Sequence, residues 1–387
     1  MEISATKLKL KRNHDLRVNH GNPWIFSNEI ENFSQLKQLE KGSLVIVQIK
    51  DADFAIAYFN PQSLIAARIL SYNASEKIDE DFFVKRILDA KNLRDKFFAK
   101  PFYRLIHSEA DFLPGLIIDR FDNYFTCQIS TAGMEKLAPT LIAALQKTFP
   151  NCIIIFKNDV ENRKLEGLEN YVKTVAGEIS GDIEIEENDI KYLLDIKDGQ
   201  KTGWFFDQRI NRDFIAQISK DCNVLDAFCY LGGFGLNALK GGAKSVTFVD
   251  SSEAAIEKIK NRNLENVDAI CEKVFDFLEN TDKQFDVVLL DPPAFIKNKK
   301  DFFSGIKGYE KLIKLGASVT KKGGILMISS CSHHASLADL TSAANNAFRK
   351  SNRCAKLIRV FGAGYDHPLH PALKESEYLK SITFIID

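Results

Sequence analysis

The chain has 387 residues, more than one ordinary domain, so we expect two or three domains that each bury a hydrophobic core. Its 52 basic and 52 acidic side chains give a formal net charge of zero, so overall charge does not indicate a nucleic-acid or membrane partner. No apolar run reaches the roughly 18 residues that cross a bilayer, and the seven scattered cysteines contain no C-x-x-C pair. We therefore expect a cytoplasmic protein without membrane association, disulfides or metal.

Residues 1–72 are predicted to form a small β-rich domain. Three short apolar strands, separated by turn-forming residues, are expected at 43–49, 54–59 and 64–70. The first 24 residues carry five basic and two acidic side chains, and they include Lys11, Arg12 and Trp24. Such a charge run is as often a solvated face as a nucleic-acid contact, so both interpretations stay open.

Residues 73–182 are predicted to form a central α/β domain. Helices are expected at 79–98 and 135–148. Strands are expected at 113–119, 124–130 and 152–156. The acidic stretch 181–189 is interpreted as a solvated hairpin or linker edge, and it marks the next domain boundary.

Residues 183–387 are predicted to form a doubly wound parallel sheet, because strands and helices alternate there. The expected strands are 223–228, 245–250, 269–274, 285–291 and 324–330. Helices are expected from residue 235, from residue 252 and over 309–320. Ligands of such sheets bind beyond the carboxyl ends of the strands, so the residues that close each strand are the candidates for function.

A glycine-rich turn follows the first of these strands. Asp226 lies near the strand end, and Gly232, Gly233 and Gly235 allow the backbone to approach a ligand at a helix N-terminus. The next strand ends in Asp250, whose carboxylate is placed to accept both hydroxyls of a ribose. The combination indicates a nucleoside ligand.

The spacing of these glycines decides which nucleoside is expected. A nicotinamide dinucleotide normally requires G-x-G-x-x-G to hold its pyrophosphate, and the sequence GGFG does not provide that spacing. S-adenosylmethionine has no pyrophosphate, and its amino-acid end fits such a turn. We therefore predict S-adenosylmethionine as the cofactor.

The strand at 285–291 ends in a rigid Asp-Pro-Pro turn. Asp291, Pro292 and Pro293 fix the direction of the local carbonyl and carboxylate groups, and Phe295 is available to stack on a planar base. A rigid loop without a ligand is the simpler alternative. Turns of this kind also serve methylation of ring or exocyclic nitrogens, so the turn alone does not choose the reaction.

Cys331 favours carbon methylation over nitrogen methylation. It ends the strand after Asp-Pro-Pro, so both residues are expected to face one pocket. Carbon 5 of cytosine accepts a methyl group only after a thiolate has added to carbon 6, whereas nitrogen methylation needs no thiol. A lone cysteine on a strand is more often a core residue. Lys297, Lys299 or His333 is expected to supply the positive charge that favours the thiolate.

At this point the chain resembles the RlmI-type 23S rRNA 5-methylcytosine methyltransferases over essentially its whole length. The shared motifs are NPWIF at 22–26, LPGLIIDRF at 113–121, KTGWFFDQR at 201–209, VLDAFCYLGGFG at 224–235, LLDPPAF at 289–295, SSCSH at 329–333, DHP at 366–368 and YLK at 378–380. So many motifs in order make chance similarity implausible.

The resemblance implies an N-terminal PUA RNA-binding domain, a central α/β domain and a C-terminal Rossmann-like class I methyltransferase domain. It implies that Cys331 is the nucleophile and that Asp291 contacts the target base. The cofactor-binding residues are then expected to be Asp226, Phe228, Tyr230, Gly232, Gly233, Gly235, Asp250, Glu272, Asp207, Gln208 and Arg209. The substrate-binding residues are expected to be Pro292, Pro293, Phe295, Lys297, Lys380, Lys11, Arg12 and Trp24.

Three features depart from the family pattern. His107 and Phe112 occupy glycine positions of the family motif G-E-S-D-G-L-P-G. Lys273 stands where the family commonly has the aspartate that holds the adenine amino group, and Glu272 or Asp276 could substitute for it. The PUA domain is only mildly basic, so its RNA binding is expected to be weak and sensitive to salt.

Three functions are compatible with these residues. The first is methylation of cytosine carbon 5 in 23S rRNA or in a large-subunit assembly intermediate, and a homodimer is compatible with it. The second is rRNA guanine-nitrogen methylation, in which Cys331 would be dispensable. The third is an inactive ribosome-associated RNA-binding protein, although the complete glycine turn, Asp250, Asp291 and Cys331 argue against lost activity.

Overall fold

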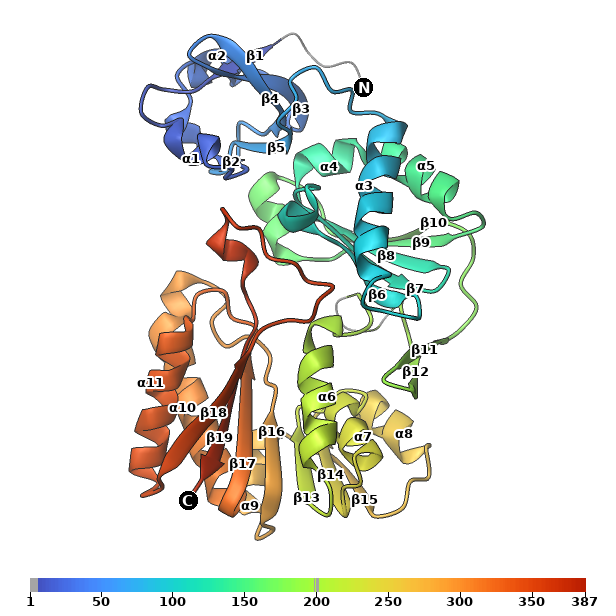
Figure 1. Ribbon diagram of the computed structural model, residues 1–387, viewed down its shortest axis with the longest axis vertical. Coiled ribbons are helices and arrows are strands. Elements are labelled where there is room, and N and C mark those ends of the chain that lie inside the picture. The colour runs from blue at the N-terminus through green and yellow to red at the C-terminus, as the bar shows by residue number, and fades with distance from the viewer. Residues whose placement is uncertain (1–5, 198, 200–201) are drawn as a thin grey trace. The chain divides into compact units, whose positions relative to one another are not determined.

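The computed structural model describes residues 6–197, 199 and 202–387 (Figure 1). Backbone contacts divide the chain into two compact units. The first unit contains the described residues up to Ile185, those of Leu193–Phe206, and Tyr365–Ser376. The second unit contains Glu186–Tyr192, Asp207–Gly364 and Glu377–Asp387. The domain ranges 1–72, 73–182 and 183–387 stay a prediction.

The N-terminal part of the first unit is a five-stranded sheet, as the β-rich composition predicts. Its order is β1-β3-β4-β5-β2, formed by Lys7–Lys9, Ser43–Ile49, Ala52–Phe59, Ala67–Ser71 and Trp24–Ile25. Short helices α1 (Leu16–Asn19) and α2 (Phe33–Leu36) accompany it. The alternating apolar residues of β3 and β4 pack into one core with Leu8, Ile25 and Phe59.

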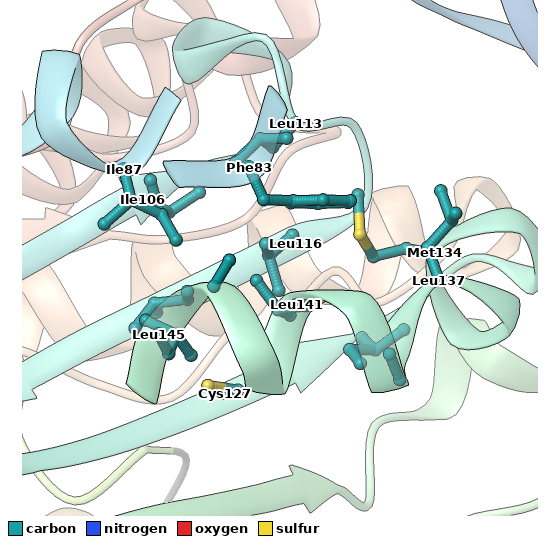
Figure 2. Close-up of a cluster of buried hydrophobic side chains, with 14 of the residues drawn as sticks. Phe83, Ile87, Ile106, Leu113, Leu116, Cys127, Met134, Leu137, Leu141 and Leu145 are labelled. Carbon is teal, nitrogen blue, oxygen red and sulfur yellow. The ribbon is translucent and has the colours of Figure 1, made fainter. Parts of the chain in front are cut away.

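A second five-stranded sheet in the same unit has the order β10-β9-β8-β7-β6. Its strands are Tyr171–Ala176, Ile153–Asn158, Tyr124–Ile129, Leu116–Phe121 and Phe102–His107. Helices α3 (Glu80–Arg94), α4 (Ala132–Lys136) and α5 (Ala138–Thr148) belong to this part. Figure 2 shows side chains of α3 and α5, including Phe83 and Leu141, in the core that they share with the sheet. The single helix expected at 135–148 is two helices, because Pro139 begins α5 afresh.

A buried ion pair ties helix α3 to the loop after β6. Arg94 is fully buried, and its two terminal nitrogens lie 2.6 and 2.7 Å from the carboxylate oxygens of Asp111. Its remaining donor capacity goes to the backbone carbonyls of Arg104 and Asp366. A bidentate, fully hydrogen-bonded pair of this kind fixes the geometry of the elements that it joins.

The structure explains one of the unusual residues in the 107–115 loop. Phe112 has φ +57°, a left-handed backbone conformation that glycine adopts at little cost. The left-handed backbone conformation therefore explains why the family motif has glycine at this position, and Phe112 adopts that conformation in this chain. Its half-exposed ring lies beneath the guanidinium of Arg86, 5.2 Å from the ring centroid.

The second unit contains a seven-stranded sheet in the order β15-β14-β13-β16-β17-β19-β18. Its strands are Val267–Cys271, Ser245–Asp250, Asn223–Ala227, Phe285–Leu290, Thr320–Ser330, Lys380–Ile386 and Ala355–Phe361. The first five run parallel, as predicted, while β19 runs antiparallel to both of its neighbours. A hairpin of β11 (Ile183–Glu187) and β12 (Ile190–Leu194) confirms the hairpin expected at the acidic stretch.

The helices of the second unit are α6 (Arg209–Ile218), α7 (Gly233–Lys240), α8 (Glu253–Lys260), α9 (Val274–Asn280), α10 (Phe302–Val319) and α11 (Leu337–Lys350). Helices α9, α10 and α11 share one hydrophobic core with the central strands. Helix α10 begins seven residues before the expected range 309–320, because tertiary packing overrides the low helix propensity of Gly305 and Gly308. No helix among the described residues is long and apolar enough to span a membrane.

Candidate active site

The candidate site lies at the carboxyl-terminal edge of the parallel strands of the second unit. Residues Ala227 and Leu290 are paired across β13 and β16, and Leu290 and Ile328 are paired across β16 and β17. Asp291 and Cys331 therefore leave the sheet from neighbouring strands at one edge. Strands β16 and β17 are neighbours, as expected, and the expectation that Asp291 and Cys331 face one pocket stays a prediction.

Asp226 is buried beneath the glycine turn. Its Oδ2 accepts a hydrogen bond of 2.7 Å from the backbone N–H of Gly235 at the start of α7. Its Oδ1 has no hydrogen-bond partner among the described residues. The pKa of Asp226 is raised to about 7, mainly by burial and also by the nearby charges of Asp291 and Asp250, while the Gly235 hydrogen bond opposes the shift.

The glycines of the turn have more than one role. A Cβ on Gly232 would lie 2.9 Å from the ring of Phe248, and one on Gly235 would overlap the same ring. Both glycines thus let the turn pack onto β14. Phe228 and Tyr230 also take left-handed backbone conformations, with φ +63° and +49°, so the loop is tightly coiled.

Asp250 is oriented by two backbone donors. Its Oδ2 accepts from the N–H of Tyr230 and its Oδ1 from the N–H of Ser252, each at 2.9 Å. Each carboxylate oxygen keeps a further lone pair for a ligand hydroxyl. Glu272, the next candidate, donates its backbone N–H to the carbonyl of Asp250, which places it beside that strand end.

The last three residues of the KTGWFFDQR motif, Asp207, Gln208 and Arg209, contact three separate partners. Gln208 donates from Nε2 to Oδ1 of Asp291 at 2.9 Å, while the buried Asn211 donates to the Gln208 Oε1 and so fixes the amide. Asp207 accepts from the hydroxyl of Tyr378 at 2.6 Å. Arg209 forms a buried ion pair with Glu187 of the hairpin, and its expected place near the cofactor stays a prediction.

Cys331 is partly buried and lies among hydroxyl groups and one lysine. The hydroxyl of Tyr309 bonds to both Ser330 and Ser332, at 2.8 and 2.9 Å. Lys380, opposite Ser330 in the sheet, donates to the carbonyl of Ser332 at 3.2 Å. Burial lowers the pKa of Lys380, and the nearby charges of Glu377 and Cys331 partly oppose this effect.

A further lysine lies next to the loop that carries Cys331, besides those expected from the sequence to supply positive charge. The sequence offered Lys297, Lys299 or His333 for this role. All three are exposed, and the His333 ring lies 5.5 Å from that of Tyr378. Lys380 is buried and its pKa is affected by the charge of Cys331, so it is an additional candidate, and the role of the three sequence candidates stays a prediction.

Some of the residues that follow Asp291 pack against the protein itself. Pro292 is buried and Pro293 is exposed. The ring of Phe295 packs on that of Tyr309, with centroids 4.7 Å apart, so its role in stacking on a base stays a prediction. The backbone N–H of Ile296 donates to the hydroxyl of Ser332 at 3.3 Å, which links this loop to the one that carries Cys331.

The substrate residues expected in the first unit differ in their exposure and contacts. Lys11 and Arg12 are exposed, and Lys11 donates to the carbonyl of Asn28. Trp24 donates its indole N–H to Glu109 at 2.7 Å, and the Arg68 guanidinium lies 5.5 Å from its ring centroid. Trp24 therefore packs within its own unit.

Comparison with known proteins identifies the family. Residues 8–72 match a PUA-like domain, and residues 166–347 match an S-adenosylmethionine-dependent methyltransferase. The chain is 36% identical to ribosomal RNA large subunit methyltransferase I of Aliivibrio fischeri strain MJ11, and 37% identical to the protein of that name from Vibrio vulnificus strain CMCP6. Both alignments cover 97% of this chain and 98% of the relative.

The chain belongs to the ribosomal RNA large subunit methyltransferase I family.

Solved structures of low identity confirm the fold. A methyltransferase from Streptococcus mutans matches with a TM-score of 0.81 and 20% identity. A methyltransferase complexed with SAH matches with a TM-score of 0.83 and 22% identity. Each match covers 98% of this chain and 100% of the other. The PUA-like domain and the Rossmann-like methyltransferase domain predicted from the sequence are confirmed.

The edge of the sheet fits the cofactor of this methyltransferase family. S-adenosylmethionine carries a sulfonium and an ammonium, and the carboxylates of Asp250 and Asp291 lie close enough to Asp226 to raise its pKa. Clustered carboxylates stabilise a cationic ligand. The unpartnered Oδ1 of Asp226 and the oriented carboxylate of Asp250 are acceptors for an ammonium and for ribose hydroxyls. S-adenosylmethionine is the cofactor, and these residues would hold it.

Cofactor affinity is expected to depend on the ionisation of Asp226. Because a cationic ligand favours the ionised carboxylate, affinity should fall by up to about tenfold per pH unit as pH drops below about 7. Titration calorimetry with S-adenosylmethionine from about pH 8 to about pH 6 measures this. Asp226→Asn should bind more weakly at high pH and show a flatter profile. The ligand's own titration is common to both proteins, so identical profiles would contradict the prediction.

The sequence alone missed several residues of this family member's site. These residues are Asn211, Tyr309 and Tyr378. Tyr378 lies in the YLK motif, but the motif gave no chemical reason to assign it a role, and the other two lie in no motif. Tyr309 and Tyr378 contact Ser332 and Asp207, which lie 23 and 171 residues away in the chain, and only the fold brings these pairs together. Asn211 lies three residues after its partner Gln208, at the start of helix α6.

Proposed function

We propose that this chain transfers a methyl group to carbon 5 of a cytosine in large-subunit rRNA, with Cys331 as the nucleophile. The observation that carries the proposal is the position of Cys331 directly after β17, beside the strand that ends in Asp291. A purely structural cysteine would not need a partly exposed position at the ligand-binding edge of the sheet. The PUA-like domain and the names of the relatives support rRNA as the substrate.

The chemistry assigns separate roles to the residues of this edge. The Cys331 thiolate adds to carbon 6 of cytosine, which makes carbon 5 nucleophilic. S-adenosylmethionine supplies the electrophilic methyl group. Loss of the carbon 5 proton to solvent or a base then restores the double bond as the thiolate leaves. In this proposal Asp291 accepts from the exocyclic amino group of the base, and its hydrogen bond from Gln208 supports a fixed orientation of the carboxylate.

Identification of the methylated nucleoside tests the proposal. Protein-free large-subunit rRNA is incubated with the full chain and labelled S-adenosylmethionine, digested to nucleosides and separated. Label in 5-methylcytidine is expected. Label in methylguanosine would replace the proposal by guanine-nitrogen methylation. Absence of transfer to free rRNA and to large-subunit assembly intermediates, with intact cofactor binding, would show that rRNA is not the substrate.

Lys380 is expected to support the thiolate without touching the base. An ammonium beside a thiol stabilises the thiolate, so Lys380→Gln should lower the transfer rate at neutral pH by about tenfold or more. The acid limb of the pH–rate profile should move to higher pH, because the thiol then ionises less readily. Cofactor affinity should stay unchanged.

Two variants separate this positioning role from a structural one. Lys380→Arg keeps the charge and should restore much of the rate. Lys356→Gln removes an exposed lysine from the neighbouring strand β18 and should leave the rate and its pH profile as they are. An unchanged acid limb in Lys380→Gln would argue that Lys380 only stabilises the fold.

A further inference from the structure

The start of helix α10 carries an exposed aromatic ring among lysines. Phe303 is 79% exposed, and its only ring partner among the described residues is Phe302, at 5.4 Å and nearly perpendicular. A single exposed apolar side chain is common on protein surfaces and means little alone. Its surroundings make this one informative.

Four exposed lysines flank Phe303 along the chain. They are Lys297, Lys299, Lys300 and Lys307. None of the four ammonium groups forms an ion pair within the part of the chain that the structure describes, and Asp301 is the one acidic residue between them. Lys307 lies four residues after Phe303 and so on the same helix face. The segment therefore presents uncompensated positive charge around an aromatic ring.

Close packing fixes this segment against the active edge of the sheet. A Cβ on Gly305 would overlap Ile296 and would lie 2.9 Å from the carbonyl oxygen of Phe295. Only a glycine lets the first turn of α10 approach the loop after Asp291 so closely. Because the N–H of Ile296 also bonds to Ser332, Phe303 is carried by a segment anchored beside Cys331.

We propose that Phe303 and these lysines form a second RNA contact, in which the ring stacks on an unpaired base that flanks the target nucleotide. Single-stranded nucleic acid is bound by aromatic rings that stack on bases and by cations that follow the phosphates. The segment supplies an aromatic ring and cations, and it directly follows the loop after Asp291. The inference rests on the proposed function for its choice of RNA and adds that the bound RNA is single-stranded next to the target.

Removal of the ring tests the stacking contact. The full-length chain is titrated with a labelled single-stranded oligoadenylate of about 12 nucleotides, a length within the usual range for such sites. Phe303→Ala should weaken binding by about fivefold or more, and Phe303→Tyr should restore it. Leu165→Ala removes an apolar side chain of similar exposure, 76%, and should have no effect.

A tryptophan at this position gives a direct signal. Both native tryptophans, Trp24 and Trp204, belong to the first unit, so Phe303→Trp introduces a reporter into the second unit. The fluorescence of this added tryptophan is the emission of the variant minus that of the native protein. It should be quenched when the oligonucleotide binds, because a stacked base quenches the indole. No added quenching would overturn the stacking contact.

Removal of charge tests the phosphate contacts. Each phosphate contact with a single strand contributes about 0.7 to the slope of log affinity against log salt. Lys299→Ala with Lys300→Ala should therefore reduce that slope by about 1.4. The matched control is Lys220→Ala with Lys244→Ala, two exposed lysines that precede β13 and β14 at the opposite edge of the sheet. Equal slopes in the two double variants would overturn the contact.

The outcomes distinguish this inference from the proposed function. If native protein methylates rRNA and Phe303→Ala binds the oligonucleotide as tightly as native protein, the inference is wrong and the proposed function stands. If Phe303→Ala binds RNA normally but fails only on an assembled ribosomal particle, the ring contacts protein and the inference is equally wrong. If native protein binds S-adenosylmethionine but neither binds nor methylates RNA, both are wrong.

Discussion

Cys331→Ala is expected to lower the rate of methyl transfer to rRNA by at least about a thousandfold, because carbon 5 of cytosine is not nucleophilic without the thiol adduct at carbon 6. Affinity for S-adenosylmethionine should change little, since the acceptors proposed for it lie on β13 and β14. Single-turnover transfer of label to protein-free large-subunit rRNA, with calorimetry for the cofactor, measures both quantities.

Two comparisons make this prediction specific to Cys331. Cys354→Ala removes an exposed thiol before β18, away from the active edge, and should leave the rate unchanged. RNA containing 5-fluorocytidine should accumulate as a covalent adduct with the native chain, because fluorine cannot leave carbon 5 as a proton does. Cys331→Ala should form none. Label that persists in methylguanosine after this substitution would exclude the thiol mechanism.

The strand ends of the site were predictable because the carboxyl ends of parallel strands meet at one edge. Asp226, Asp250, Asp291 and Cys331 each follow an apolar segment, and alternating strands and helices already define the edge. No knowledge of distant contacts was needed. The predicted strands therefore end within one residue of β13, β14, β16 and β17, whereas the strand expected at 269–274 is β15, Val267–Cys271, and helix α9 begins at Val274.

The contributions from antiparallel strands were not predictable in the same way. Lys380 comes to lie beside Cys331 because β19 inserts between β17 and β18, and register pairs it with Ser330. The alternation of apolar and polar residues shows which face of a strand is buried, but it does not show which strands lie beside it in the sheet. The residues alone therefore suggested Lys297, Lys299 and His333 for this charge, and Lys380 was predicted only as a substrate-binding residue, through the family resemblance.

The basic N-terminal stretch shows a second limit of sequence reasoning. Lys7 and Lys9 form ion pairs with Asp53 and Asp51, and Arg17 pairs with Glu29. Local charge counts cannot reveal partners that the fold brings from another strand. Much of the charge that suggested an RNA surface in this domain is thus balanced within the domain itself.

Arg94→Met is expected to lower the free energy of unfolding of the first unit by about 3–5 kcal/mol, because it leaves the buried carboxylate of Asp111 without its counter-ion. It also leaves the carbonyls of Arg104 and Asp366 without their donor. Urea unfolding followed by tryptophan fluorescence reports on this unit, since Trp24 and Trp204 both belong to it.

The expected loss comes from the uncompensated charge, and neutralising that charge should recover part of it. Adding Asp111→Asn to Arg94→Met keeps an acceptor for the backbone N–H of His107 but removes the buried anion. Lys91→Met, on the same helix, breaks the exposed pair with Asp95 and should cost less than about 1 kcal/mol. If Arg94→Met cost no more than Lys91→Met, the pair would add no net stability. If the double variant were as unstable as Arg94→Met, packing and lost hydrogen bonds would account for the effect.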